Sequence, residues 1–185
     1  NSTHPSIADV LLKIISLEFH PTVMAAEGEG AYEHMMRVAE KFKGKFIFAV
    51  EGAVPVAHDG KCCVVAEADH HEVTMTEVTK VLAANAAAVL AVGTCAAYGG
   101  IPAGKGNETG AMGVSAFLKK EGIPAPVINI PGCPPHPDWI VGTIGLGLQA
   151  LATNTLGLLV KQGLDANGRP KAFYKNVHMN CPHLS

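Results

Sequence analysis

Two kinds of apolar pattern alternate along the chain. Runs of consecutive apolar residues bounded by Gly or Pro are typical of buried strands, and apolar residues at helical spacing predict amphipathic helices. The strand-like runs are residues 46–50, 87–92 and 126–130. The helix-like segments are residues 31–42, 73–82, 112–120 and 138–151, of which the first is ended by Gly44. This order predicts an α/β fold, with a parallel sheet flanked by helices and right-handed crossovers.

Weaker patterns leave the secondary structure of some segments less clearly defined. Residues 7–15 carry apolar positions at helical spacing, and the overlapping residues 14–19 could form a strand. A short strand is expected at residues 62–66, after the Asp59-Gly60 turn. Asn167-Gly168 predicts a hairpin turn between residues 158–164 and residues 171–174.

Composition narrows the class of protein. The 185 residues are enough for one domain with a substantial core. Hydrophobic residues make up 48% and charged residues 16%, with a mean hydropathy of +0.23, so we expect surplus apolar surface to meet a partner. No apolar run is long enough for a membrane span. The net charge of -2 does not favour binding to nucleic acid.

Two cysteine motifs follow the second and third strand-like runs. Gly93-Thr94-Cys95 comes after residues 87–92, and Pro131-Gly132-Cys133-Pro134-Pro135-His136-Pro137 comes after residues 126–130. Open α/β folds bind their ligands at the carboxyl edge of the sheet, so both thiols are expected there. Two converging thiolates indicate a metal centre, for which iron–sulfur and zinc are the natural candidates.

Glu51 stands at the end of the first strand-like run. A carboxylate beside a thiolate-bound centre tunes its potential or relays protons, whereas elsewhere the same residue caps a helix or pairs with a lysine. The pattern leaves both interpretations open. His136, inside the proline-rich motif, is expected either to support the metal ligands through a hydrogen bond or to lock the loop.

Other Cys and His residues favour simpler interpretations. Cys62-Cys63 begins an apolar strand and is expected to pack as small buried hydrophobic residues. His70-His71 precedes a helical pattern and is expected at a solvated helix start. The five cysteines are an odd number without the regular spacing of a disulfide framework, so they do not reveal the redox compartment.

The motifs together resemble the small subunit of nickel–iron hydrogenases, including the nickel–iron–selenium group. The resemblance runs nearly end to end, and the proline-rich string is its most specific part. It is carried by residues 17–25 (LEFHPTVMA), 50–53 (VEGA), 93–100 (GTCAAYGG) and 131–137 (PGCPPHP). It implies a flavodoxin-like fold, which agrees with the pattern of strands and helices.

The resemblance also implies roles for particular residues. Cys95 and Cys133 would bind a proximal [4Fe-4S] cluster, and His178 with Cys181 would supply half the ligands of a distal [4Fe-4S] cluster. The other ligands, including a Cys-x-x-Cys ahead of Asn1, are expected outside this sequence, which we therefore interpret as a truncated segment. Residues 1–152 would form the proximal-cluster domain, and residues 153–185 a connecting hairpin and the start of the distal region.

The implied function is electron transfer within a heterodimeric hydrogenase. Electrons would pass through the clusters between a Ni-Fe centre in an obligate large subunit and an external carrier such as a cytochrome or ferredoxin. The implied location is periplasmic or membrane-associated. We expect the large subunit to cover an apolar cluster edge formed by Ala96, Ala97, Gly99, Gly100, Ile101, Pro134 and Pro135, with Glu51 near its boundary.

Two alternative functions would use the same edge of the sheet. The iron–sulfur subunit of complex I-type quinone reductases shares both cysteine strings, but its adjacent cysteines belong on an earlier loop than Cys62-Cys63, and it has no counterpart of His178 and Cys181. A flavodoxin-like module would bind flavin mononucleotide at this edge, but the cysteines and rigid prolines argue against it. Visible absorption separates iron–sulfur from flavin.

Overall fold

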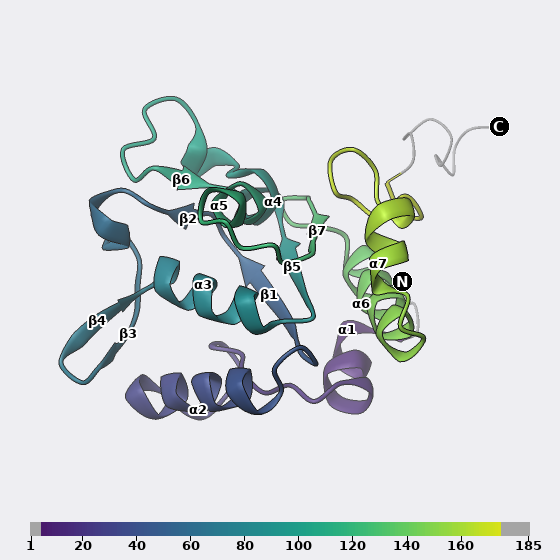
Figure 1. Ribbon diagram of the computed structural model, residues 1–185, viewed down its shortest axis with the longest axis horizontal. Coiled ribbons are helices and arrows are strands. Elements are labelled where there is room, and N and C mark those ends of the chain that lie inside the picture. The colour runs from purple at the N-terminus through teal and green to yellow at the C-terminus, as the bar shows by residue number, and fades with distance from the viewer. Residues whose placement is uncertain (1–4, 175–185) are drawn as a thin grey trace.

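A parallel sheet of three strands forms the centre of the molecule (Figure 1). The computed structural model describes residues 5–174. The strands are β1 (Ile47–Glu51), β5 (Ala88–Val92) and β7 (Val127–Ile130), in the order β1-β5-β7. Their register aligns Glu51 with Val92 and Val92 with Ile130, so the three strands end on one line.

Helices cover both faces of this sheet. On one face, Val89 and Ala91 of β5 pack in a core with Phe117 and Leu118 of α5 (Val114–Lys120). The short helix α4 (Thr94–Tyr98) contributes Ala96 and Ala97 to the same core. α3 (Met75–Asn85) reaches this core through Ala83, and joins α2 (Gly28–Lys41) in a neighbouring core through Leu82.

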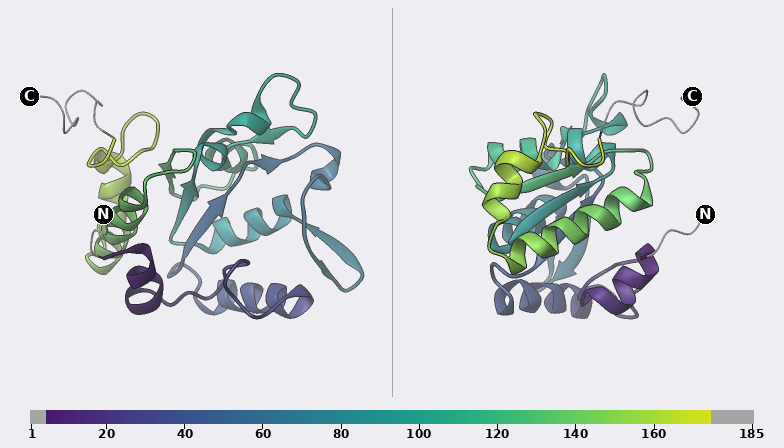
Figure 2. Two further views of the ribbon diagram at one scale, coloured as in Figure 1. Left: turned by 180° about the vertical axis from the view of Figure 1, so that it is seen from behind. Right: turned by 90° about the vertical axis from the view of Figure 1, so that its right-hand side faces the viewer.

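The opposite face is covered by the C-terminal part of the chain (Figure 2). Leu90 of β5 and Ile128 and Ile130 of β7 pack against residues of α6 (Pro137–Ala152), Trp139 among them. They also pack against the helical turn Leu159–Gly163, which follows the short helix α7 (Leu156–Leu158). Alternate residues of β5 therefore face opposite layers, which explains why the strands read as continuous apolar runs. The predicted α/β fold, a parallel sheet flanked by helices, is confirmed.

Two small antiparallel pairs lie outside the central sheet. β2 (Val54–Pro55) pairs with β6 (Ala111–Met112), and β3 (Val64–Ala68) pairs with β4 (His71–Thr74) in a hairpin that projects from the molecule (Figure 1). β4 runs directly into α3 through a capping box, in which the Thr74 hydroxyl accepts from the Glu77 N–H and the Glu77 carboxylate accepts from the Thr74 N–H.

Several sequence-based boundaries were wrong by a few residues. The helix predicted at 31–42 begins earlier, at Gly28, and the strand predicted at 62–66 is displaced to Val64–Ala68. The segment 112–120 divides into the end of β6 and α5, and the helix predicted at 138–151 extends by one residue at each end. Residues 7–14 are helical, as α1 (Ile7–Asp9) and the π-helical turn Val10–Ile14. The strand considered at 14–19 does not form.

Two larger errors have a clear physical reason. Val73 was assigned to a helix over 73–82, but it lies in β4, because the Asp69-His70 turn pairs β4 with β3. The hairpin predicted around Asn167-Gly168 has its turn but not its strands. Residues 156–163 are helical, with Leu159 and Val160 packed on the sheet, and in place of two paired strands Leu164 and Pro170 form a single bridge.

Two further expectations concern the chain as a whole. Within residues 5–174, no helix is both long and apolar enough to cross a membrane. The division into residues 1–152 and 153–185 stays a prediction, although its boundary falls at the end of α6.

Candidate functional site

The candidate site lies at the carboxyl edge of the parallel sheet. The loops after β5 and β7 leave the sheet side by side, because Val92 and Ile130 are partners in its register. Cys95 lies at the start of α4, directly after β5, and the loop after β7 carries Cys133; we call these two segments the cysteine loops. The parallel pairing of two adjacent strands thus brings together the segments of two cysteines that are far apart in sequence.

Hydrogen bonds continue the pairing beyond the strands. The Gly93 N–H donates to the carbonyl of Ile130 at 2.9 Å, and the Thr94 N–H donates to the carbonyl of Gly132 at 2.9 Å. In return, the Gly132 N–H donates to the Thr94 hydroxyl oxygen at 3.0 Å. Thr94 and Gly132 directly precede Cys95 and Cys133, so these reciprocal bonds hold the two cysteine loops against each other.

Glycine is required where the backbone passes close to the Cys95 thiol. A Cβ on Gly100 would lie 2.6 Å from the Cys95 sulfur and 2.9 Å from its Cα, and Gly100 has a φ of +54°. At Gly132, a Cβ would lie 2.4 Å from the Cα of Pro135. The glycines flanking the two thiols therefore allow a compact arrangement that no other residue permits.

Neither cysteine is fully buried within the chain. Cys95 is half-buried in the first turn of α4, and Cys133 is exposed; both are free thiols. Thiolates are the usual ligands of iron–sulfur clusters, and such a cluster takes four. The pair therefore fits a cluster as half of its ligand set. Among the residues that the structure describes, no group of three or more His, Cys, Asp or Glu side chains is placed to hold a metal ion.

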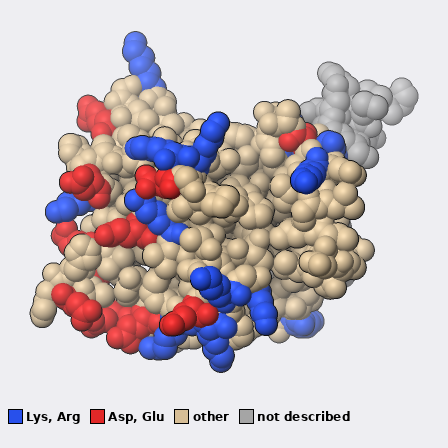
Figure 3. Space-filling model, in the orientation of Figure 1, with Lys and Arg blue, Asp and Glu red and all other residues tan. Residues whose placement is uncertain are grey.

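His136 begins α6 directly after the Cys133 loop. Its Nδ1 accepts from the Asp138 N–H at 3.2 Å, which caps the helix, and its ring lies 5.8 Å from the ring of Trp139, centroid to centroid. This geometry agrees with the expected role in locking the loop. The charged side chains gather elsewhere: in the view of Figure 3, the part of the surface over α6 and α7 is nearly free of charge.

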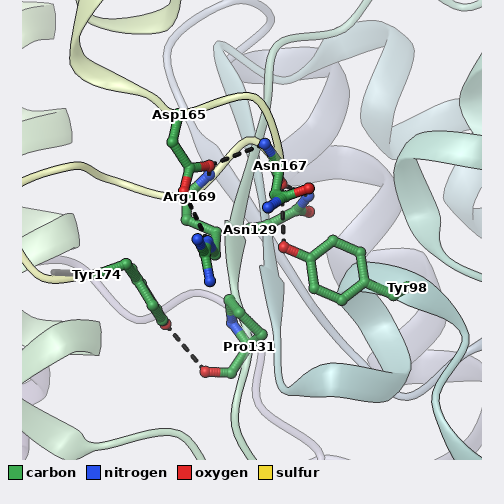
Figure 4. A network of polar contacts seen from close by, with 7 residues as sticks. All are labelled: Tyr98, Asn129, Pro131, Asp165, Asn167, Arg169 and Tyr174. Carbon is green, nitrogen blue, oxygen red and sulfur yellow. Dashed lines mark hydrogen bonds and ion pairs between the residues drawn. The ribbon is translucent and has the colours of Figure 1, made fainter. Parts of the chain in front are cut away.

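A polar network reaches the same edge from the C-terminal side (Figure 4). Its centre is the turn 165–169, where Asp165 pairs with Arg169 at 2.7 Å. From this turn, contacts extend to Tyr98 and Asn129, while Tyr174 donates to the carbonyl of Pro131 at 3.0 Å. Sequence reasoning missed this network, although Asn129, a polar residue inside the apolar run 126–130, was a signal for it.

Burial raises the pKa of both tyrosines in the network. Tyr174 and Tyr98 are partly enclosed, so the charged phenolate is poorly solvated and the hydroxyl stays a hydrogen-bond donor across the physiological pH range. Burial opposes ionisation of Asp165 as well, but hydrogen bonds from the backbone and side chain of Arg169 outweigh it and lower the pKa of that carboxyl. The Asp165–Arg169 pair is therefore charged at neutral pH.

The other candidate residues lie apart or outside the described residues. Glu51 ends β1 at the same sheet edge and is exposed, so its proposed relay or tuning role stays a prediction. His178 and Cys181 lie outside residues 5–174. The expectation that Cys62 is buried was wrong, because it is exposed in the loop ahead of β3. His70-His71 lies in the β3–β4 hairpin rather than at a helix start.

The expected apolar edge needs a correction too. Ala96, Ala97 and Gly99 are buried inside this chain, where they face the core between α4 and α5. Ile101 and Pro134 are exposed, and the exposed Tyr98 joins them. A surface for a partner at this edge is therefore smaller than the sequence suggested.

Comparison with known proteins settles the family. The family model described as NADH ubiquinone oxidoreductase, 20 Kd subunit, matches residues 1–146. The chain belongs to this family. Within it, the chain is 50% identical over 190 residues to the periplasmic [NiFeSe] hydrogenase small subunit of Desulfomicrobium baculatum, covering all of this chain and 60% of that protein. It is 40% identical to the periplasmic [NiFe] hydrogenase small subunit of Solidesulfovibrio fructosivorans, covering 97% of this chain and 51% of that protein.

Solved structures agree with these relatives. A chain of the recombinant [NiFeSe] hydrogenase from Desulfovibrio vulgaris Hildenborough superposes with a TM-score of 0.93 at 64% identity, covering 99% of this chain and 66% of that one. The resemblance to hydrogenase small subunits is thereby confirmed, and the quinone-reductase alternative, although it gives the family model its description, is not favoured. The chain spans about half to two thirds of the length of these relatives.

Proposed function

We propose that the chain is the electron-transfer part of a hydrogenase small subunit, acting in the reaction H2 ⇌ 2 H+ + 2 e-. The observation that carries the proposal is the convergence of Cys95 and Cys133 at one sheet edge, in a chain 64% identical to a chain of a solved [NiFeSe] hydrogenase. Relatives named periplasmic support a periplasmic location. The electrons would leave to an external carrier such as a cytochrome or ferredoxin.

Cys95 and Cys133 would hold a [4Fe-4S] cluster together with ligands from outside the described residues. When bound, such a cluster supplies one-electron transfer. The protein's own part is to fix the two thiolates: the Thr94–Gly132 bonds set the spacing of the loops, and Gly100 leaves room beside the Cys95 sulfur. His178 and Cys181 would hold a second, distal cluster.

A large subunit carrying the Ni-Fe centre would cover part of the surface. Ile101 is 88% exposed and lies at the cysteine edge, and the surface over α6 and α7 offers a further area with few charges (Figure 3). Burying such surface against a partner stabilises a complex. Glu51, exposed at the end of β1, would lie near this boundary.

The test uses the purified heterodimer with Cys133→Ala and Cys95→Ala. Each variant should lose the iron and the electron paramagnetic resonance (EPR) signal of one cluster and reduce an artificial acceptor more slowly with hydrogen. Hydrogen–deuterium exchange at the large subunit should persist, because exchange needs no outward electron flow. Cys62→Ala is the matched control and should behave as wild type. If Cys133→Ala and Cys95→Ala retain full iron content and all cluster signals, the proposal is wrong.

A further inference from the structure

The segment 165–174 contains a turn with its own rigid frame. The Asp165 carboxylate accepts from the backbone N–H groups of Asn167 and Arg169, both at 2.9 Å, and from the Arg169 side chain at 2.7 Å. The Gly168 N–H donates to the carbonyl of Asp165 at 2.9 Å. One carboxylate thus fixes the backbone on both sides of the tip, so the turn is preorganised before it contacts anything else.

The tip of this turn contacts the strand and the helix that carry the cysteine loops. The carbonyl of Asn167 accepts from the Tyr98 hydroxyl at 3.1 Å and from the Asn129 side-chain amide at 2.8 Å. The carbonyl of Gly168 accepts from the Asn129 N–H at 2.8 Å. Gly168 has a φ of +73°, and a Cβ there would lie 3.0 Å from the Asn129 side-chain nitrogen, so this close docking favours glycine.

The far end of the segment contacts the Cys133 loop. Tyr174 donates from its hydroxyl to the carbonyl of Pro131 at 3.0 Å. The Tyr174 ring lies 5.2 Å from the Arg169 guanidinium and 4.6 Å from the ring of Trp139. Because its neighbours are the fixed turn and α6, the Tyr174 hydroxyl is held in place toward the Pro131 carbonyl.

We propose that residues 165–174, the clamp segment, act on the two cysteine loops as one positioning device, with Tyr98 and Tyr174 as its contacts. Tyr98 lies three residues after Cys95, and Pro131 lies two residues before Cys133. The clamp segment therefore connects the two loops by a route that does not use the Thr94–Gly132 bonds. The inference rests on the proposed function, since the group positioned is the cluster held by Cys95 and Cys133.

The decisive variant is Tyr174→Phe in the purified heterodimer. It keeps the ring against Arg169 and Trp139 and removes only the hydroxyl that donates to Pro131. Loss of a group that orients metal ligands commonly weakens metal retention by about tenfold or more. We expect iron release into a chelator to be about tenfold faster and the EPR signal of the Cys95/Cys133 cluster to change shape, while the other clusters' signals stay unchanged.

Tyr32→Phe is the matched control, because Tyr32 is a residue of α2 and packs in the core that α2 shares with α3, which the clamp segment does not enter. Tyr98→Phe is the second variant and should change the same signal in the same direction, but less, since Tyr98 is 46% exposed. The double variant should show less than the sum of the two effects, because both contacts act through one segment.

The outcomes separate the two proposals. If Tyr174→Phe and Tyr98→Phe release iron and give EPR spectra as Tyr32→Phe does, the clamp is wrong while Cys133→Ala still supports the proposed function. A lower melting temperature with an unchanged cluster signal also overturns the clamp, since it shows a role in folding alone. Should Cys133→Ala keep the signal, the proposed function itself fails.

Discussion

The cysteine edge and the segment leading into the β3–β4 hairpin each have two thiols, but only those of the cysteine edge are held by an ordered arrangement of strands and loops. Cys62 and Cys63 are adjacent in sequence and stand next to a hairpin that also carries His70 and His71, a composition that suggests metal binding. In the structure Cys62 is exposed, and the His71 ring is hydrogen-bonded to the Glu77 carboxylate at 3.3 Å.

Cys95 and Cys133 are far apart in sequence, yet they leave adjacent strands whose register and loop hydrogen bonds hold them together. The backbone around them is closely packed, and Gly100 lies against the Cys95 sulfur. The difference shows that a candidate site follows from topology and close packing, and that neighbouring potential ligands in a sequence are weak evidence for one.

The largest expected contrast between the two regions is in stability. Ile130 is fully buried at the end of β7, directly before the Cys133 loop, whereas Val65 in β3 is 44% exposed. Ile130→Ala leaves a cavity under the cysteine edge and should lower the free energy of unfolding by about 2–5 kcal/mol. Val65→Ala should change it by less than about 0.5 kcal/mol. Urea unfolding followed by the fluorescence of Trp139, the single tryptophan, measures both.

Equal losses in the two variants would contradict the comparison, because they would mean that the hairpin contributes as much to the fold as the sheet edge does. Ile130→Val serves as a graded control. Its smaller cavity should cost about 0.5–1.5 kcal/mol, between the two other variants.

Gly100→Ala tests the close packing around Cys95. The added methyl group would meet the sulfur and the backbone of Cys95, so the variant should lose about 1–3 kcal/mol more than a control glycine that also has a positive φ. Gly106→Ala is that control, since Gly106 has a φ of +100° and open space around its Cα. Iron content of the purified heterodimer should fall only in Gly100→Ala. Equal iron in both variants would show that the Cys95 sulfur tolerates displacement.

The sequence was sufficient to predict the centre of the molecule. The three apolar runs became β1, β5 and β7, and their parallel direction followed from the helical segments between them. Since parallel strands end at one edge, the loops of Cys95 and Cys133 were placed correctly side by side without any contact being known.

The periphery was harder to predict because tertiary packing overrides local patterns there. Residues 158–164 contain the spacing of a strand as well as that of a helix, and packing against Leu90 and Ile128 decided for the helix. The contacts of the clamp segment could not be predicted from the sequence, for a different reason. Its contacts join Tyr98, Pro131 and Asn167, which no local pattern connects.

The smallest expected effect concerns pH and belongs to the hairpin side. Hydrogen bonds from the backbone and hydroxyl of Thr74 lower the pKa of Glu77 below its ordinary value of 4.5, against a smaller effect of burial. In the unfolded chain the carboxyl titrates near that ordinary value. The capping box therefore contributes its full stability above about pH 4.5 and loses it as the pH falls through the folded pKa.

Glu77→Gln keeps an oxygen that can accept from Thr74 but cannot titrate. Urea unfolding of both proteins at pH 7 and pH 4 measures the contribution of the Glu77 carboxylate together with its contact to His71, which lies 3.3 Å away. The wild type should lose more stability on acidification than the variant, by less than about 1 kcal/mol, since the Glu77 side chain is 47% exposed. An equal loss in both would mean that the capping box does not respond to acid, and a loss of several kcal/mol would place Glu77 in a far less solvated setting than the hairpin side provides.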